Sequence, residues 1–347
     1  MSKLIKEFGS DFHFCDFPKN KEKTILKLYE NSILLGNGRN AFQLLFEKYK
    51  WKRIWMPTYF CYIVINALKN FDIEVCFYND NPISKEDAEN IAKIPFEKGD
   101  VLLRINYFGL RTWRDNKNIP VPVIEDHSHD LSGDWAKNSN ADWCLASLRK
   151  TLPILCGGIL WSPKHNNINQ IQLTKECKDF AEIRYKAMNL KKDYLRGYDN
   201  VEKQIFRDLY IKSEEILDNF KCTSIDDYSN NILKELNISE WTKMRVLNWV
   251  NAENILKDNY IVLQPENLKY CNPFSLIILC DNKKQREILR NKLIKNDIYP
   301  AVLWNIPDYV LDKKAIDFGS RMLSLHCDGR YNEEDINFMC SIIKDIK

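Results

Sequence analysis

The stretch Val123-Ile124-Glu125-Asp126-His127-Ser128-His129 joins the end of an apolar run to a group of acids and histidines. The run at residues 121–124 is short and apolar, which is typical of a buried strand. Ligands of open α/β sheets bind beyond the carboxyl ends of the strands, where Asp126 and His129 are expected. An aspartate there can hold a cationic nitrogen, and the histidine can hydrogen-bond the same ligand. A capping aspartate in a solvated turn is the alternative interpretation.

Short apolar runs and helix-like segments alternate on both sides of this stretch. The predicted strands are residues 53–56, 73–78, 101–105, 121–124, 141–146 and 158–161, and the predicted helices are 38–49, 60–68 and 84–92, with Ser84 as the last helix's N-cap. Strands separated by helices of this length predict an α/β fold with a mostly parallel sheet flanked by helices.

The second half of the chain has a different pattern. Its predicted elements are a long charged helical region at 169–218, a helix at 239–256, a strand at 274–280, a basic helix at 283–295, a strand at 322–325 and a helix at 333–346. We therefore expect a large α/β domain at residues 1–220 and a small C-terminal α/β domain at residues 221–347.

Composition narrows the class of protein. The 347 residues include 51 basic and 48 acidic side chains, giving a net charge of +3 without a basic stripe, so nucleic acid is not an expected partner. No apolar run reaches the ~20 residues that span a bilayer. The N-terminus lacks a signal-peptide core. The 11 cysteines form no CxxC pair, which predicts buried thiols in a reducing cytoplasm and no zinc site.

A possible phosphate site lies at Gly36-Asn37-Gly38-Arg39-Asn40-Ala41, directly before the first predicted helix. Glycines let the backbone approach a ligand, and a helix N-terminus offers free N–H groups to an anion. An ordinary turn into a helix is the alternative. The dinucleotide-binding fingerprint is not met, because the second glycine pair is missing.

A possible reactive lysine follows the strand predicted at 141–146, in the polar cluster from Ser147 to Thr151 that precedes Gly157-Gly158. A lysine in a closed site beside cations can lose its proton and attack a carbonyl, although most lysines are surface residues. A phosphate loop, an acid for a ring nitrogen and Lys150, in that order, are the parts of a pyridoxal phosphate (PLP) site.

These motifs resemble the DegT/DnrJ-type aminotransferases of PLP fold type I over nearly the whole chain. The matching stretches are the phosphate loop at 36–41, the segment 56–61 that covers the cofactor ring, the loop 106–109, the Glu-Asp-x-x-Gln/His motif at 124–129, the lysine motif at 141–158 and the C-terminal signature at 322–331.

The resemblance implies a role for each matching residue. Lys150 is implied as the Schiff-base lysine, Asp126 as the partner of the pyridine nitrogen, and His129 as a contact of the ring substituents. The remaining implied cofactor contacts are Gly38, Arg39, Asn40 and Ser147 at the phosphate, and Tyr59, Cys61 or Tyr62 over the ring. Ser147 and Lys150 are three residues apart, where the commonest family motif has five, and Cys61 stands where the family usually has an aromatic residue.

The family's activity implies amino transfer from an amino acid, with glutamate as the expected donor, to a nucleotide-linked keto-sugar used in surface glycans. It also implies a homodimer. Some members of the family have a histidine in place of this lysine and are dehydratases. Lys150 is retained here, which argues against that activity. Two alternatives stay open, namely a PLP enzyme acting on a non-sugar amino substrate and a catalytically silent relative that binds a nucleotide sugar.

Overall fold

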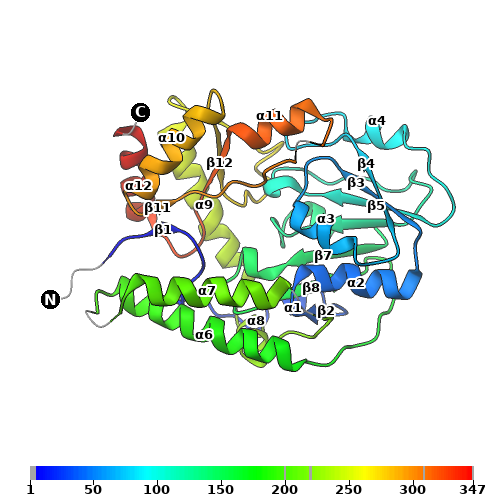
Figure 1. Ribbon diagram of the computed structural model, residues 1–347, viewed down its shortest axis with the longest axis horizontal. Helices are drawn as coiled ribbons and strands as arrows, with labels where there is room; N and C mark the ends of the chain where they lie inside the picture. The colour runs from blue at the N-terminus through cyan, green and yellow to red at the C-terminus, as the bar shows by residue number, and fades with distance from the viewer. Residues whose placement is uncertain (1–4, 199–200, 219–220, 308, 346–347) are drawn as a thin grey trace.

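The computed structural model of the protein describes residues 5–198, 201–218, 221–307 and 309–345. Its central sheet has seven strands in the order β2-β8-β7-β6-β5-β3-β4 (Figure 1). The five strands from β7 to β4 run parallel, whereas β8 and β2 are each antiparallel to their neighbours. This is the mostly parallel sheet that the sequence predicts.

The strands of this sheet match the predicted apolar runs, with one addition. They are β2 (Ile33–Leu35), β3 (Arg53–Pro57), β4 (Glu74–Tyr78), β5 (Asp100–Ile105), β6 (Val123–Asp126), β7 (Trp143–Ser147) and β8 (Gly158–Trp161). Six of the seven were predicted. The unpredicted strand β2 has three residues, too few to show a period of their own.

The helices between residues 25 and 233 pack with this sheet. They are α1 (Ile25–Leu28), α2 (Gly38–Tyr49), α3 (Tyr62–Leu68), α4 (Asp87–Ala92), α5 (Asp134–Lys137), α6 (Lys175–Leu195), α7 (Lys203–Asp218) and α8 (Asp227–Leu233). One expectation was wrong in detail. The N-cap of α4 is Glu86, because Ser84 instead accepts a hydrogen bond from the Glu86 N–H (3.3 Å) in the preceding turn.

The predicted helical region at 169–218 contains two helices. It breaks between α6 and α7, where Gly197 has a φ of +77° that a helix does not tolerate. The two helices then lie side by side as a hairpin along the lower edge of the molecule (Figure 1).

The C-terminal part forms a smaller layer on the left of Figure 1. Its elements are α9 (Ile238–Leu256), β9 (Ile261–Val262), β10 (Leu276–Leu279), α10 (Lys283–Ile294), β11 (Ile298–Tyr299), α11 (Lys313–Arg321), β12 (Met322–Leu325) and α12 (Glu333–Asp345), with an antiparallel sheet β12-β10-β9. Residue 346, the predicted end of the last helix, lies outside the described residues. No helix in the described ranges has the length and apolar character needed to span a membrane.

The segment after residue 220 packs with the large sheet before the chain reaches the smaller layer. Ser224 bridges to Leu35, and Ile225 and Leu236 belong to the hydrophobic core of the large sheet. The small layer has its own hydrophobic core. Apart from Phe8, the first residue of this core along the chain is Trp249. The division at 220/221 stays a prediction, and these contacts favour a later boundary, close to the start of α9.

The N-terminal segment joins the two layers. Its strand β1 (Phe8–Gly9) pairs in parallel with β11 of the small layer. Glu7, buried beside it, forms ion pairs with Lys191 of α6 (2.7 Å) and Lys203 of α7 (2.9 Å). The segment therefore contacts both the helical hairpin and the C-terminal layer.

Gly9 is predicted to be essential for this junction. Its φ is +87°, and an added Cβ would lie 2.4 Å from the Tyr299 carbonyl oxygen, so Gly9→Ala brings both strain and a backbone clash. Gly99→Ala is the matched control, because Gly99 has a φ of +99° but faces only the flexible side chain of Lys52. Urea unfolding should show a loss of about 1–2 kcal/mol for the control and a larger loss for Gly9→Ala. Equal losses would show that β1 is not held tightly.

Candidate active site

Asp126 is the last residue of β6 and is buried. Its Oδ1 accepts a hydrogen bond from the Ser128 N–H (2.8 Å), which fixes the carboxylate at the end of the strand. The hydroxyl of Ser128 in turn accepts from the Ser147 N–H (2.8 Å). The ends of β6 and β7 are thereby tied together, and Asp126 is held close to the segment that carries Lys150.

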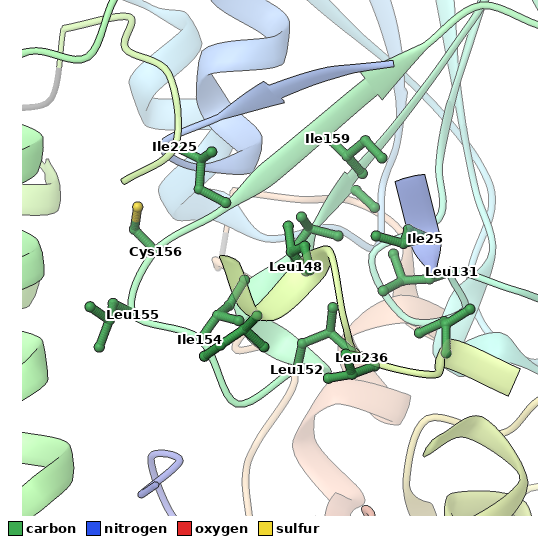
Figure 2. Packing of buried hydrophobic residues seen from close by; sticks show 14 of the residues in the cluster. Ile25, Leu131, Leu148, Leu152, Ile154, Leu155, Cys156, Ile159, Ile225 and Leu236 are labelled. Atoms are coloured by element: carbon green, nitrogen blue, oxygen red, sulfur yellow. The ribbon is translucent and has the colours of Figure 1, made fainter. Parts of the chain in front are cut away.

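Lys150 stands on a short turn of 3₁₀-helix, η2 (Leu148–Lys150), which follows β7. The turn is anchored on both sides, because Leu148 and Leu152 are fully buried in the core of the large sheet. Figure 2 shows these two side chains among Ile25, Leu131, Ile159 and Leu236. The exposed Lys150 side chain therefore projects from a fixed base.

The start of α2 faces the same turn. The N-cap Asn37 accepts from the Asn40 N–H (3.0 Å). The first N–H groups of an α-helix have no acceptor inside the helix. A Cβ at Gly38 would lie 3.3 Å from the Cβ of Ser147, so a larger residue there would need β7 or the helix start to shift by a few tenths of an ångström. Such a helix start attracts an anion.

A cavity of about 350 Å³ opens where these three elements meet. It is lined by six of the nine predicted site residues, namely Gly38, Arg39, Cys61, Asp126, Ser147 and Lys150. Three residues that the sequence reasoning missed, Asn37, Ser128 and Arg149, also line it. The predicted phosphate loop, acid and lysine thus share one cavity, although their roles stay predictions.

The other three predicted residues do not line this cavity. Asn40 is buried and serves the helix N-cap through its N–H. Tyr59 is also buried, with its hydroxyl donating to the Leu303 carbonyl and accepting from the Trp304 N–H (3.0 Å). The hydroxyl of Tyr59 is therefore already engaged by the C-terminal layer.

The third, His129, is buried in an aromatic cluster, with its ring 4.6 Å from that of Phe274. Its Nδ1 accepts from the Phe108 N–H (3.1 Å), while its buried Nε2 has no hydrogen-bond partner among the described residues. Burial, aided by the positive charge of Lys150, lowers the pKa of His129 well below its ordinary value. His129 is therefore a neutral imidazole with one nitrogen available.

Trp304 is a further aromatic residue that the sequence reasoning missed. Its ring lies 5.7 Å from that of His129, and the Nζ of Lys150 stands 5.5 Å from its centroid. A cation over an indole ring is stabilised by the ring's quadrupole. Trp304 comes from the C-terminal layer, where no local motif marks it, so only the folded chain reveals the contact.

Behind Asp126, a buried group of Glu125, His127 and Cys144 has ligand atoms within 4.8 Å of one another. The sequence pattern predicted no zinc site. Glu125 accepts hydrogen bonds from Asn116 (2.7 Å) and Ser139 (2.6 Å), and it lies 3.0 Å from a ring nitrogen of His127. The carboxylate is thus satisfied by the protein itself.

Comparison with known proteins bears on the fold. No protein-family model matches the sequence, and no curated protein matches it significantly. Solved structures do match. Spr1654 from Streptococcus pneumoniae in its PMP form superposes with a TM-score of 0.67 at 10% identity, covering 98% of each chain.

Two further structures extend this result. PseC, a Helicobacter pylori aminotransferase involved in the biosynthesis of pseudoaminic acid, has a TM-score of 0.63 at 14% identity and covers 98% of this chain and 99% of its own. The aminotransferase TlmJ from Streptoalloteichus hindustanus has a TM-score of 0.62 at 11% identity over the same shares. The chain therefore has the fold of these aminotransferases, and the predicted fold class is confirmed.

Proposed function

We propose that this protein is a PLP-dependent aminotransferase that moves an amino group from an amino acid to a keto acceptor. The observation that carries the proposal is that Asp126, Lys150 and the start of α2 line one cavity. Each is suited to a different part of PLP, and the similarity to aminotransferase structures over almost the whole chain supports the same activity.

The residues of the cavity fit this cofactor. The helix start at Gly38 and Arg39 suits the phosphate, the carboxylate of Asp126 suits a protonated pyridine nitrogen, and Lys150 is in place to bind the aldehyde carbon covalently. The available Nε2 of His129 is a buried polar atom that a ring substituent would satisfy. When bound, PLP supplies the electron sink for the reaction.

Two side chains then handle protons. Asp126 holds a proton on the pyridine nitrogen, because its negative charge stabilises the cationic form of the ring. Lys150 acts as general base and acid at the α-carbon of the substrate, removing and returning a proton through its Nζ. Its anchored turn keeps that nitrogen in the cavity.

For the substrates, we propose glutamate as the donor and a nucleotide-linked keto-sugar as the acceptor, with surface glycan synthesis in the cytoplasm as the setting. The involvement of PseC in pseudoaminic acid synthesis supports a sugar acceptor. We also propose a homodimer. Ile63 lines the cavity and is 64% exposed, and an apolar side chain at such a mouth suits a subunit contact.

An absorbance titration tests the activity. Adding PLP to the purified protein should give a visible band that borohydride removes, and adding L-glutamate should convert the spectrum to that of the amine form of the cofactor. Adding a keto-sugar nucleotide should restore it. A protein that gives no visible band after PLP addition is a catalytically silent relative, and one that responds only to non-sugar acceptors is not a sugar aminotransferase.

Gly38→Val is predicted to weaken PLP binding. The added side chain would press on Ser147 and block the approach to the first N–H groups of α2. PLP at about one hundred times its Kd should stabilise the wild-type protein by about 2.7 kcal/mol, and a tenfold weaker Kd removes about 1.4 kcal/mol of this. Thermal melts with and without PLP measure the difference.

Lys283→Val is the matched control, because Lys283 has the same first position in α10, after the N-cap Asn282. It should change the melting temperature without changing the PLP-dependent rise. If PLP raises the melting temperatures of the wild type and Gly38→Val equally, the loop is not the phosphate site.

A further inference from the structure

Two cysteines, Cys156 and Cys177, lie side by side in the core of the large sheet. Their sulfur atoms are 3.6 Å apart, and both residues are fully buried. Cys156 lies just before β8, and Figure 2 shows it in the core with Ile225, whereas Cys177 belongs to the first turn of α6. The sulfurs of a disulfide are about 2.05 Å apart, so a movement of roughly 1.5 Å would bring these two to bonding distance.

The residue after Cys156 connects the predicted phosphate loop with the turn that carries the lysine. Gly157 donates its N–H to the Gly36 carbonyl (2.8 Å), directly before the start of α2. The carbonyl of Gly157 accepts from the Leu148 N–H (3.1 Å), at the start of η2. A displacement of Cys156 therefore acts on both of these parts of the first cavity.

Both cysteines are free thiols in the structure, and hydrogen bonds hold Cys156 in this state. Its Sγ donates to Oδ2 of Asp226 (3.0 Å), and its N–H donates to the hydroxyl of Ser229 (3.3 Å), at the start of α8. Burial, with further contributions from Cys177 and Asp226, raises the pKa of the Cys156 thiol well above its ordinary value. A disulfide at Cys156 would remove the S–H donor from Asp226, because a bonded sulfur carries no hydrogen.

The position of Cys177 gives a small oxidant a route to the pair. Cys177 is the third residue of α6, and its N–H donates to the hydroxyl of the N-cap Thr174 (3.3 Å). Residues 167–174, which precede the helix, form neither helix nor strand. The ends of helices open more readily than core strands do, so the thiol becomes accessible at times while the central sheet stays folded.

We propose that Cys156 and Cys177 form a reversible disulfide when the protein meets a peroxide, and that this bond weakens binding of the cofactor. One thiol reduces hydrogen peroxide, becoming a sulfenic acid and releasing water, and the other thiol then forms the S–S bond while a second water leaves. Two electrons pass from the sulfurs to the peroxide, and a reducing dithiol returns them. Disulfides of reducing compartments are usually transient ones of this kind. The effect on the cofactor rests on the proposed function, whereas the bond itself does not.

Peptide mapping of the purified full-length protein tests the bond. Trypsin releases Cys156 within residues 151–164 and Cys177 within residues 176–178, and each peptide contains no other cysteine. After treatment with hydrogen peroxide and alkylation of the remaining thiols, mass spectrometry should find these two peptides joined. Dithiothreitol should separate them. Peptides that are found only singly after peroxide would overturn the proposal without any variant being needed.

A titration with PLP tests the effect on the cofactor. Peroxide-treated wild-type protein should bind PLP about tenfold more weakly, on the scale of one lost hydrogen bond to a charged group. Dithiothreitol followed by desalting should restore the affinity. Cys177→Ser should bind PLP as the reduced wild type does and should not respond to peroxide. Cys61→Ser is the control for oxidation within the first cavity, which Cys61 lines, and it should keep the peroxide response.

Two results of the titration would overturn the switch, namely an unchanged PLP affinity in cross-linked protein and a peroxide response that persists in Cys177→Ser. If Cys177→Ser does not fold, Cys156→Ser takes its place, because the serine hydroxyl can still donate to Asp226. A reduced wild-type protein that does not bind PLP would instead refute the proposed function. The peptide map would still decide whether the disulfide forms, so the two failures are distinguishable.

Discussion

Lys150→Ala is expected to lower the rate of amino transfer by about 10²–10⁴-fold, the contribution that a positioned general acid–base group makes. Lys150→Ala leaves the proposed phosphate and ring contacts of the cofactor unchanged, so PLP should still bind, but without the band that borohydride removes. Single-turnover absorbance measurements with L-glutamate give the rate. Lys164→Ala is the matched control. Lys164 is an exposed lysine paired with Asp142, which precedes β7, whereas Lys150 follows the other end of this strand.

Peptide mapping of the wild-type protein supplies a second readout that does not depend on turnover. Borohydride reduction of the PLP-loaded protein should place the pyridoxyl group on the peptide that contains Lys150. A label on Lys137 or Lys164 would contradict the assignment and would require a different cavity for the cofactor.

Asp126→Asn is expected to retain bound PLP but to lower amino transfer by about 10²–10³-fold, similar to the loss of one electrostatic stabiliser in other active sites. The amide keeps the size of the side chain, and it removes the negative charge that is proposed to hold the proton on the pyridine nitrogen. Equilibrium PLP titration and single-turnover rates, measured on the same preparation, separate binding from chemistry.

Asp142→Asn is the control for this substitution. Asp142 precedes the neighbouring strand β7, and its carboxylate accepts from the Val123 N–H (2.9 Å), at the opposite end of the sheet from the cavity. This variant should lose some stability and keep its turnover. Unchanged turnover in Asp126→Asn would remove Asp126 from the site.

The central sheet and the first cavity could be predicted because their signals are local. A short apolar run such as residues 121–124 predicts a strand from its own residues alone. The carboxyl ends of parallel strands meet at one edge of the sheet. Asp126 and Lys150 each follow such a run, which is why a sequence pattern places both at the same edge of the sheet.

A second cavity, of about 500 Å³, adjoins the first, and its lining has no such local signal. Arg184 lies on α6 and Glu214 on α7, whereas Asp11 lies in the segment after β1, far from both in the sequence. They meet only because the region 169–218 folds back on itself at Gly197 and because β1 crosses to the C-terminal layer. Long-range packing of this kind leaves no pattern within any one segment.

The contact between Trp304 and Lys150 likewise could not be predicted from a local sequence pattern. The family resemblance implied Tyr59, Cys61 or Tyr62 over the cofactor ring, which stays a prediction, and it gave no sign of an aromatic residue beside Lys150. The ring found over the Lys150 ammonium comes instead from a loop near residue 304, and it reaches the site through contacts between the two layers. Contacts between the two layers therefore determine which aromatic ring lies beside Lys150.

The pairing of β1 with β11 sets an order of events during synthesis of the chain. Gly9 donates its N–H to the hydroxyl of Tyr331 (2.8 Å), a contact that spans 322 residues, and its strand partner is also made late. A contact of such long sequence separation forms only after most of the chain has left the ribosome. The central sheet is complete once β8 is made, whereas the N-terminal wall of the second cavity waits for the end of translation. A nascent chain can therefore form the sheet that carries Asp126 and Lys150 well before its N-terminal segment is bound to the C-terminal layer.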